Sequence, residues 1–255
     1  MDHAEVLALF DRQMRREARP DGPDVRVERD ADVVRQVGPP HAWNGVLWSG
    51  LDEGSADAAV ARQVRFFGDL GLGFEWKLYA HDRPADLADR LLAAGFAAEP
   101  AETVMVARVA DLDTEVRPPD GVSLVPVTDA AGVRALVEVH ELAFGADGSR
   151  LRDHLLARLS DDTVVPVLAV ADGRAVSAAR LDLSPGTSFA GLWGGGTVPG
   201  WRGRGLYRAL VAWRARRAAA RGYDYLQVDA SGQSRPILLG LGFVPLTTTT
   251  PYVRD

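Results

Sequence analysis

The sequence predicts an α/β fold in two halves, each with helices on both sides of a mixed sheet. Apolar residues at helical spacing alternate with short runs of β-branched and aromatic residues along the chain. The order strand, polar turn, short helix, Gly-Phe, strand occurs at residues 75–96 and again at 225–243, which indicates a duplication. Between the two copies, residues 111–121 carry acids and prolines and have little to bury. We therefore expect domains at residues 1–110 and 122–255, joined by a linker at 111–121.

The first half begins with a helix over residues 4–18, where apolar residues form a stripe that a Pro-Asp-Gly-Pro cluster ends. A second apolar stripe at helical spacing starts near Ala59 and ends near Gly71. The other elements expected here are strands at 25–37, 43–51, 74–80 and 103–109, and a helix at 84–94.

The second half opens with a strand at 122–127, and Asp129 is placed to cap a helix over residues 130–144. A two-residue Asp172-Gly173 turn predicts a hairpin of strands 164–171 and 175–183. The remaining elements expected are helices at 149–159, 206–221 and 234–241, and strands at 189–198, 225–229 and from 243 onward.

The composition excludes several kinds of chemistry. The chain of 255 residues has no cysteine, so disulfides, thiolate zinc sites and cysteine nucleophiles are ruled out. The five histidines show no metal-ligand spacing, and we expect no metal. The formal net charge of −6 disfavours nucleic acid or an anionic membrane as the partner of the whole surface. No signal peptide or membrane-length apolar run is visible, so we expect a cytoplasmic protein.

A glycine-rich run at residues 194–207 lies between an expected strand and an expected helix. Consecutive glycines allow main-chain N–H groups to turn toward an anion, and a helix start adds unpaired donors and a positive dipole end. The run has no Gly-Lys-Ser/Thr triplet, and Arg208 stands where a dinucleotide-binding fingerprint needs a third small residue. The pattern therefore predicts a phosphate or pyrophosphate site that is neither of these two common kinds.

The segment Arg202-Gly203-Arg204-Gly205-Leu206-Tyr207 resembles the coenzyme A pyrophosphate loop of the GNAT superfamily of N-acetyltransferases. It departs from that pattern at Tyr207, where glycine or alanine is usual. The resemblance extends over residues 122–252 and implies two GNAT-like three-layer α/β halves with mixed, mostly antiparallel sheets. It also implies acetyl-CoA as cosubstrate, held by the backbone of Thr197 and Val198 and by the N–H groups of Arg202, Gly203, Arg204, Gly205, Leu206 and Tyr207.

Seven arginines and no acid lie between residues 201 and 221. We expect Arg202 and Arg204 to serve the anionic ligand. The others on the helix (Arg214, Arg216, Arg217 and Arg221) are expected to form a solvated face. The opposite face is expected to pack in the core through Leu206, Ala209, Leu210 and Trp213.

The catalytic residues are less clearly marked than the coenzyme loop. Because the chain has no cysteine to form an acyl-enzyme, we expect an amine to attack the thioester directly in a ternary complex. By the resemblance, Val198 N–H is an oxyanion donor, and Leu238 replaces the usual general-acid tyrosine. Asp229 is a candidate to orient or deprotonate the amine, or else a cap of the next turn. Ser234 is a second candidate, or else a helix N-cap. Glu141 is a third, while its neighbour His140 is expected to pack in the core.

Three functional hypotheses remain open: an acetyl-CoA-dependent N-acetyltransferase, a non-catalytic acyl-CoA-binding module, and, disfavoured by charge, a nucleic-acid module using the arginine strip. The acceptor would be a small-molecule or protein amine, whose identity the sequence does not give. The first half has acids at Asp52-Glu53-Gly54-Ser55 before its helix, so we expect it to bind no coenzyme. It could cover a sheet edge, wall the acceptor cleft or form a homodimer contact.

Overall fold

The structure, a computed structural model, describes all 255 residues, which form two compact units. Unit 1 contains Met1–Met105, Asp229–Pro236 and Pro245–Asp255, and unit 2 contains Val106–Val228 and Ile237–Val244. The expected linker at 111–121 lies within unit 2. The compact units are therefore a different division from the expected domains 1–110 and 122–255, which stay a prediction.

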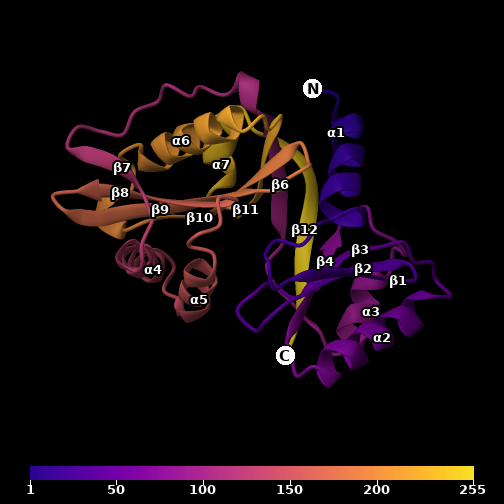
Figure 1. The fold of residues 1–255 in the computed structure, drawn as a ribbon. Helices are drawn as coiled ribbons and strands as arrows, with labels where there is room; N and C mark the ends of the chain where they lie inside the picture. Colours follow the sequence, from indigo (N-terminus) through magenta and orange to yellow (C-terminus); the bar gives the residue numbers. More distant parts are fainter. The chain divides into compact units, whose positions relative to one another are not determined.

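Unit 1 is built on a sheet with the strand order β1-β2-β3-β4-β12, and the short β5 pairs with β12 (Figure 1). Strands β3 and β4 are parallel, while the pairs β1–β2, β2–β3 and β4–β12 are antiparallel. The elements are α1 His3–Phe10, the π-helical η1 Asp11–Arg16, β1 Arg26–Asp30, β2 Val33–Val37, β3 Gly45–Ser49, α2 Ala56–Asp69, β4 Phe74–Tyr79, α3 Leu87–Ala93, β5 Ala97–Ala98 and β12 Val244–Arg254.

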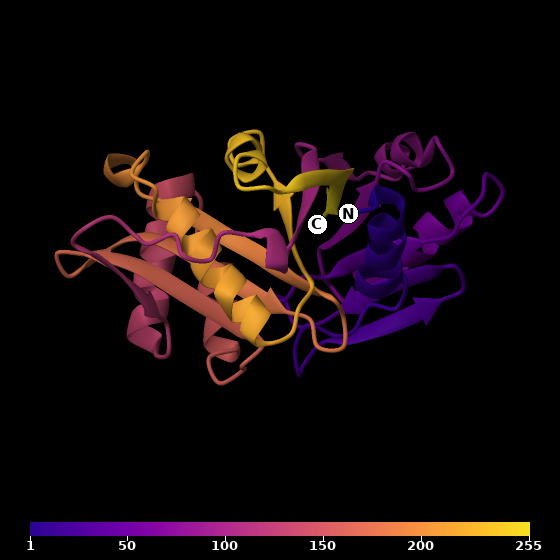
Figure 2. The same cartoon turned by 90° about the horizontal axis from the view of Figure 1, so that it is seen from above.

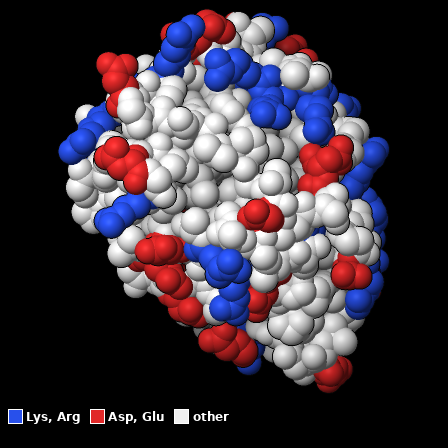
Figure 3. Space-filling view, turned by 60° about the vertical axis from the view of Figure 1, so that its left-hand side comes forward, with Lys and Arg blue, Asp and Glu red and all other residues white.

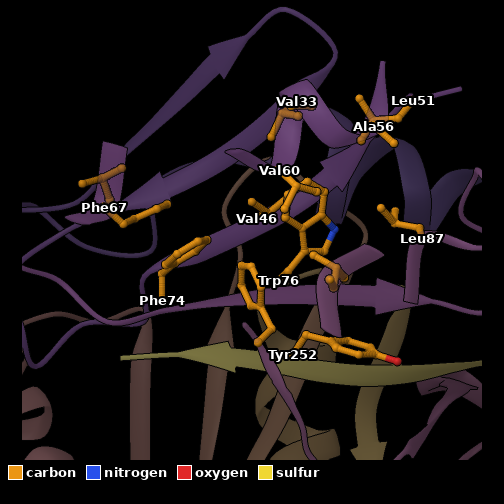
Figure 4. Packing of buried hydrophobic residues seen from close by; sticks show 14 residues of the cluster. Val33, Val46, Leu51, Ala56, Val60, Phe67, Phe74, Trp76, Leu87 and Tyr252 are labelled. Carbon is orange, nitrogen blue, oxygen red and sulfur yellow. The ribbon is translucent and has the colours of Figure 1, made fainter. Parts of the chain in front are cut away.

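The main core of unit 1 lies between its sheet and helices α2 and α3 (Figure 4). Trp76 is 1% exposed at its centre, and the rings of Phe67 on α2 and Phe74 on β4 stack with centroids 4.2 Å apart. Tyr252 on β12 is 7% exposed and also belongs to this core. Its burial among apolar side chains explains the position structurally.

Unit 2 is built on a sheet with the strand order β7-β8-β9-β10-β11, in which only β10 and β11 are parallel. Its elements are η2 Val109–Asp111, β7 Val122–Pro126, α4 Ala130–Phe144, α5 Ser149–Ala157, β8 Val164–Ala171, β9 Arg174–Leu183, β10 Phe189–Thr197, η3 Pro199–Trp201 and α6 Leu206–Ala220. Three further elements contain residues of both units: β6 Glu102–Arg108, β11 Tyr225–Ala230 and α7 Arg235–Leu239; the first residue of β12, Val244, also belongs to unit 2.

The sheet of unit 2 has helices on both faces, as Figures 1 and 2 show. Leu168 and Ala178 pack with α4 and α5, whereas their neighbours Ala169 and Ala179 belong to the clusters that contain α6 residues. Side chains alternate between the faces of a strand, so each strand supplies two cores. The expected three layers and the mixed, mostly antiparallel sheet are confirmed. No helix is both long and apolar enough to cross a membrane.

The two units repeat one arrangement of elements. In each, an antiparallel run of strands ends in a parallel pair that one long helix connects: β3-α2-β4 in unit 1 and β10-α6-β11 in unit 2. A short helix follows each time, α3 or α7. This common order agrees with the duplication expected from the sequence.

The expected strand at residues 25–37 is wrong in one respect, because it is a hairpin. Asp30 pairs with Val33, so Ala31 and Asp32 form a two-residue turn. Ala31 has a φ of 51°, a left-handed conformation in which alanine is rare. No Asn-Gly or Asp-Gly pair marks this turn, so the sequence pattern continued through it.

Candidate functional site

The glycine loop of unit 2 connects β10 to α6 in a conformation that requires glycine. Gly203 has a φ of +74° and Gly205 a φ of +82°, in the left-handed region that other residues adopt at a cost. A Cβ atom added at either position would meet no atom within 4 Å. Backbone conformation, and not crowding, therefore explains these two glycines.

The main-chain N–H groups of residues 203–208 have no hydrogen-bond acceptor in the structure. The N-cap of α6 is Gly205, and no side chain caps the helix. The first N–H groups of a helix have no partner within it, and the helix dipole adds partial positive charge there. A row of free amides at a helix start, in an exposed loop, is a binding arrangement for a phosphate or pyrophosphate.

The end of β10 is where the structure corrects the expected oxyanion donor. Val198 N–H donates to the carbonyl oxygen of Val176 at 3.1 Å, so this amide is already used. Successive N–H groups of a strand point to opposite edges, which turns Thr197 N–H away from β9. Thr197, and not Val198, therefore presents its amide on the edge that β9 leaves open.

Strands β10 and β11 pair over only three residues each, from Phe189 with Tyr225 to Gly191 with Gln227. Strand β10 continues to Thr197, and its register against β9 shifts between Trp193 and Gly196. Beyond Gly191, β10 thus has an edge without backbone pairing to β11. This edge leads directly to the loop that carries the free amides.

The arginines of the loop and of α6 play different parts. Arg202 donates to the carbonyl oxygens of Thr197 at 3.1 Å and of Ala143 at 2.9 Å, so it joins the loop to β10 and α4. Arg204 lies over the ring of Trp201, 4.6 Å from its centroid. Arg216, Arg217 and Arg221 are exposed as expected. The expectation for Arg214 was wrong, because it is 1% exposed.

Tyr207 is half-buried and its ring lies against the backbone of β10. A Cβ atom added at Gly195 would be 2.9 Å from Cε2 of the Tyr207 ring, so the missing side chain of Gly195 makes room for it. Burial raises the pKa of Tyr207, and the charge of Arg214 opposes this rise. A bulky residue at the last position of the loop is thus accommodated by a glycine in the facing strand.

The three candidate catalytic residues do not all belong to the same unit. Glu141 is exposed on α4, and its Oε1 accepts the N–H of Gly148 at 3.1 Å. Asp229 and Ser234 belong to unit 1, and the hydroxyl of Ser234 donates weakly to the carbonyl of Ser231 at 3.4 Å. Leu238 is fully buried and provides no hydroxyl. The catalytic roles of these three residues stay predictions.

Asp229 forms a buried ion pair with Lys77 of β4, and its side chain is only 3% exposed. Its Oδ2 accepts from Lys77, while its buried Oδ1 has no partner. Burial alone would lower the pKa of Lys77, but the carboxylate of Asp229 outweighs it and raises that pKa. The side chain of Asp229 thus forms an ion pair and does not cap the following turn.

His140 is half-buried on α4, with its ring centroid 4.8 Å from that of Phe144. Its Nδ1 is buried and has no hydrogen-bond partner. Burial lowers its pKa, although the carboxylate of Glu141 acts in the opposite direction. The sequence predicted that His140 packs in the core, whereas in the structure it is half-buried beside the exposed Phe144.

In the corresponding loop of unit 1, between β3 and α2, the side chain of Asp52 accepts hydrogen bonds from the loop itself. Oδ1 of Asp52 accepts the N–H of Gly54 at 3.0 Å and that of Ser55 at 2.8 Å, together with the Ser55 hydroxyl at 2.7 Å. The hydrogen bond from the Ser55 side chain is the main reason why the pKa of Asp52 is lowered. The donors that remain free in unit 2 are thus partly used in unit 1.

Comparison with known proteins supports the fold. No family model matches the sequence, and no curated protein matches it either. Among solved structures, a GCN5-related N-acetyltransferase from Kribbella flavida superposes with a TM-score of 0.72 at 17% identity, over 99% of this chain and 95% of that one. A tandem GNAT protein from the clavulanic acid biosynthesis pathway superposes with a TM-score of 0.63 at 14% identity, over 99% of this chain and 94% of that one. This chain has the GNAT fold.

A functionally unknown conserved protein from Staphylococcus epidermidis also shares the GNAT fold, with a TM-score of 0.72, 12% identity and coverage of 91% of this chain and 94% of that one. The match to a tandem GNAT protein over nearly the whole length fits the repeated arrangement of the two units.

The face of the molecule drawn in Figure 3 carries Lys and Arg next to Asp and Glu and is not uniformly basic.

Sequence reasoning missed two features of this GNAT-fold chain. One is the buried Arg214, which was expected to be exposed because it belongs to a run of arginines on a helix. The other is the pair of Lys77 and Asp229, which lie 152 residues apart and therefore share no local pattern. The one available indication of the second was a lysine in a strand whose other residues, apart from Glu75, are aromatic or apolar.

Proposed function

We propose that this chain is an acetyl-CoA-dependent N-acetyltransferase whose coenzyme loop is the β10–α6 connection of unit 2. The observation that carries the proposal is the row of N–H groups at residues 203–208, which have no acceptor and stand at an uncapped helix start. Such a row suits the diphosphate of coenzyme A, and Arg204 adds positive charge at the same loop. The GNAT fold supports the assignment of the loop.

In this proposal the pantetheine arm lies along the open edge of β10. Thr197 offers its amide there, and Arg202 holds the strand end and the loop together through two carbonyl oxygens. A neutral amine attacks the thioester carbonyl directly, because the chain has no cysteine to form an acyl-enzyme. The side chains of unit 2 then have to stabilise the carbonyl oxygen and supply a proton to the thiolate.

Unit 1 is proposed to bind no coenzyme, since Asp52 already occupies the amides of its loop and would repel a diphosphate. Asp229 and Glu141 remain candidates to contact the acceptor amine. The acceptor is proposed to be a small-molecule or protein amine.

Binding and turnover, measured on the same full-length chain, test the proposal. Acetyl-CoA and coenzyme A should raise the thermal midpoint in a concentration-dependent manner, whereas nucleotides without the pantetheine arm should do so less. A panel of amines, screened for thiol release from acetyl-CoA, should contain an acceptor that becomes acetylated. Absence of any coenzyme effect would contradict the proposal.

A non-catalytic acyl-CoA-binding module is the second candidate, and the buried Leu238 favours it because this position offers no acid. Tight coenzyme binding without acetyl transfer to any amine of the panel would select this function.

A further inference from the structure

The leaving group of the proposed reaction requires a proton, and the structure offers few groups in unit 2 to supply one. The hydroxyls of Ser177 and Thr197 lie 2.8 Å apart, and Ser177 also donates to the carbonyl of Gly196 at 2.7 Å. Leu238 is apolar and buried. The phenol of Tyr207, beside β10, makes no hydrogen bond within the protein and is therefore free to supply the proton.

The ring of Tyr207 lies beside the irregular part of β10, where that strand is not paired with β11. Its ring contacts Gly195, inside the register shift between Trp193 and Gly196 and two residues before Thr197. As the second residue of α6, it also contributes its own N–H to the row of free amides. One residue thus connects the diphosphate loop with the irregular part of the strand.

Arg214 lies on the same side of α6 as Tyr207, two helical turns further on. Its Nε donates to the carbonyl of Leu210 at 3.0 Å and its Nη1 to that of Arg180 at 3.1 Å. Its buried Nη2 has no partner. No carboxylate forms a salt bridge with this 1% exposed guanidinium, although buried charges are normally paired.

Burial lowers the pKa of Arg214 to about 10, while the proximity of Tyr207 and Asp182 raises it. The guanidinium is therefore still charged at neutral pH. Its electrostatic coupling to Tyr207 is mutual, so the same charge favours the phenolate.

We propose that Tyr207 is the proton donor to the coenzyme thiolate and that Arg214 is a positioning residue that stabilises the resulting phenolate. This inference rests on the proposed N-acetyltransferase function. The amine nitrogen forms a bond to the carbonyl carbon, the carbon–sulfur bond breaks, and the sulfur takes the phenolic proton. The phenolate then recovers a proton from solvent, to which the acylated nitrogen has released its own, so the products are the amide and the free thiol.

The two residues are needed together for an energetic reason. A tyrosine phenol ordinarily has a pKa of about 10 and a thiol one of about 8.5, so proton transfer from phenol to thiolate is uphill. Burial of Tyr207 increases this difference. A buried cation near the phenolate reduces this difference in pKa. This role would explain why a buried guanidinium with an unpaired Nη2 stands at position 214.

The test compares Tyr207→Phe with Tyr223→Phe in the full-length chain. The first variant keeps the ring against Gly195 and removes only the hydroxyl. The second makes the same change at Tyr223, which lies outside the loop. Like Tyr207, it is half-buried and has an arginine nearby, Arg221. Tyr207→Phe should lower kcat about 100-fold and leave the Kd for acetyl-CoA within about twofold, whereas Tyr223→Phe should change neither.

Arg214→Gln gives an independent readout, because the ultraviolet titration of tyrosine reports the phenol directly. This variant should raise the titration midpoint of one tyrosine by about one pH unit, and the effect should vanish in the double variant with Tyr207→Phe. Urea unfolding of each variant confirms that the fold is retained. An unchanged titration in a folded Arg214→Gln variant would overturn the role of Arg214.

Two results would overturn the role of Tyr207 and leave the proposed function intact: acetyl transfer by Tyr207→Phe at the rate of Tyr223→Phe, or full activity of Tyr207→Ala with tighter coenzyme binding. The second would mean that the ring only fills space. If the unaltered chain neither binds acetyl-CoA nor releases thiol, the proposed function fails and this inference fails with it.

Discussion

Replacement of Gly205 by alanine tests whether the conformation of the loop determines coenzyme binding. Gly205 has a φ of +82°, and a Cβ atom there would meet nothing within 4 Å. The substitution therefore introduces no clash and acts only through the backbone. A non-glycine residue in the left-handed region costs roughly 1–2 kcal/mol.

The loop is exposed and free to relax, so the alanine variant is expected to leave the binding conformation and to have to recover it when coenzyme binds. A cost of about 1–2 kcal/mol corresponds to a Kd for acetyl-CoA that rises roughly 5- to 30-fold. Isothermal titration calorimetry measures this change, and urea unfolding measures stability in parallel.

Two other glycines provide matched controls. Gly200 lies in the same loop, has open space around its Cβ position and lacks a positive φ, so Gly200→Ala should leave the Kd within about twofold. Gly222 has a φ of +77° at the other end of α6, so Gly222→Ala should lower the free energy of unfolding by about 1 kcal/mol without changing the Kd. Equal Kd values for Gly205→Ala and Gly200→Ala would refute the argument that this left-handed residue shapes the site.

Three further predictions concern the charged groups. Lys77→Met leaves the carboxylate of Asp229, whose side chain is 3% exposed, without its partner, and should lower the free energy of unfolding measured in urea by about 3–5 kcal/mol. Adding Asp229→Asn should recover part of this loss, and strictly additive losses would contradict the pairing. Burial raises the pKa of Glu102 to about 6, so the stability that its protonated form contributes is complete below about pH 4.5 and is lost as the pH rises through 6. At pH 7, Glu102→Gln should therefore have a free energy of unfolding about 1 kcal/mol higher than that of the unaltered chain, after allowance for solvent access. A difference in stability that does not vary between pH 4 and 7 would argue against this. Arg202→Gln should weaken acetyl-CoA binding up to about tenfold in calorimetry because two hydrogen bonds that hold the loop are lost, while the exposed Arg216→Gln should have no such effect; equal Kd values would show that the loop does not depend on Arg202.

Local patterns explain which elements the sequence predicted correctly. The helix α4 matches its expected bounds, because Asp129 accepts the N–H of Gly132 at its start and Gly145 adopts a left-handed conformation at its end. The Asp172-Gly173 turn also has the two positive φ values that its residues favour. The turn at Ala31 lacks such residues, and the hairpin around it was missed.

Long-range packing explains the errors at Arg214 and Val198. The helix α6 is buried on more than its expected apolar side, since Val211, Ala212 and Ala215 are buried as well. A side chain on such a helix has little access to water whatever its charge, and periodicity alone does not show this. The use of Val198 N–H by Val176 likewise depends on strand register, which a sequence pattern leaves open.

The two loops of this chain show how one fold can keep its geometry while only one copy keeps a free anion site. Both units join a parallel strand pair by a helix, and both helix starts carry N–H groups that need an acceptor. In unit 1 that acceptor is part of the chain, since one oxygen of Asp52 accepts two amides and a hydroxyl. The N-cap of α2 is Ser55, whose own amide is one of the two, whereas in unit 2 the N-cap is Gly205 and no side chain accepts the amides of its loop. An internal carboxylate thus occupies amides of the loop before α2, whereas the loop before α6 leaves its amides to water or a ligand, and this difference is the physical basis for proposing coenzyme binding in unit 2 alone.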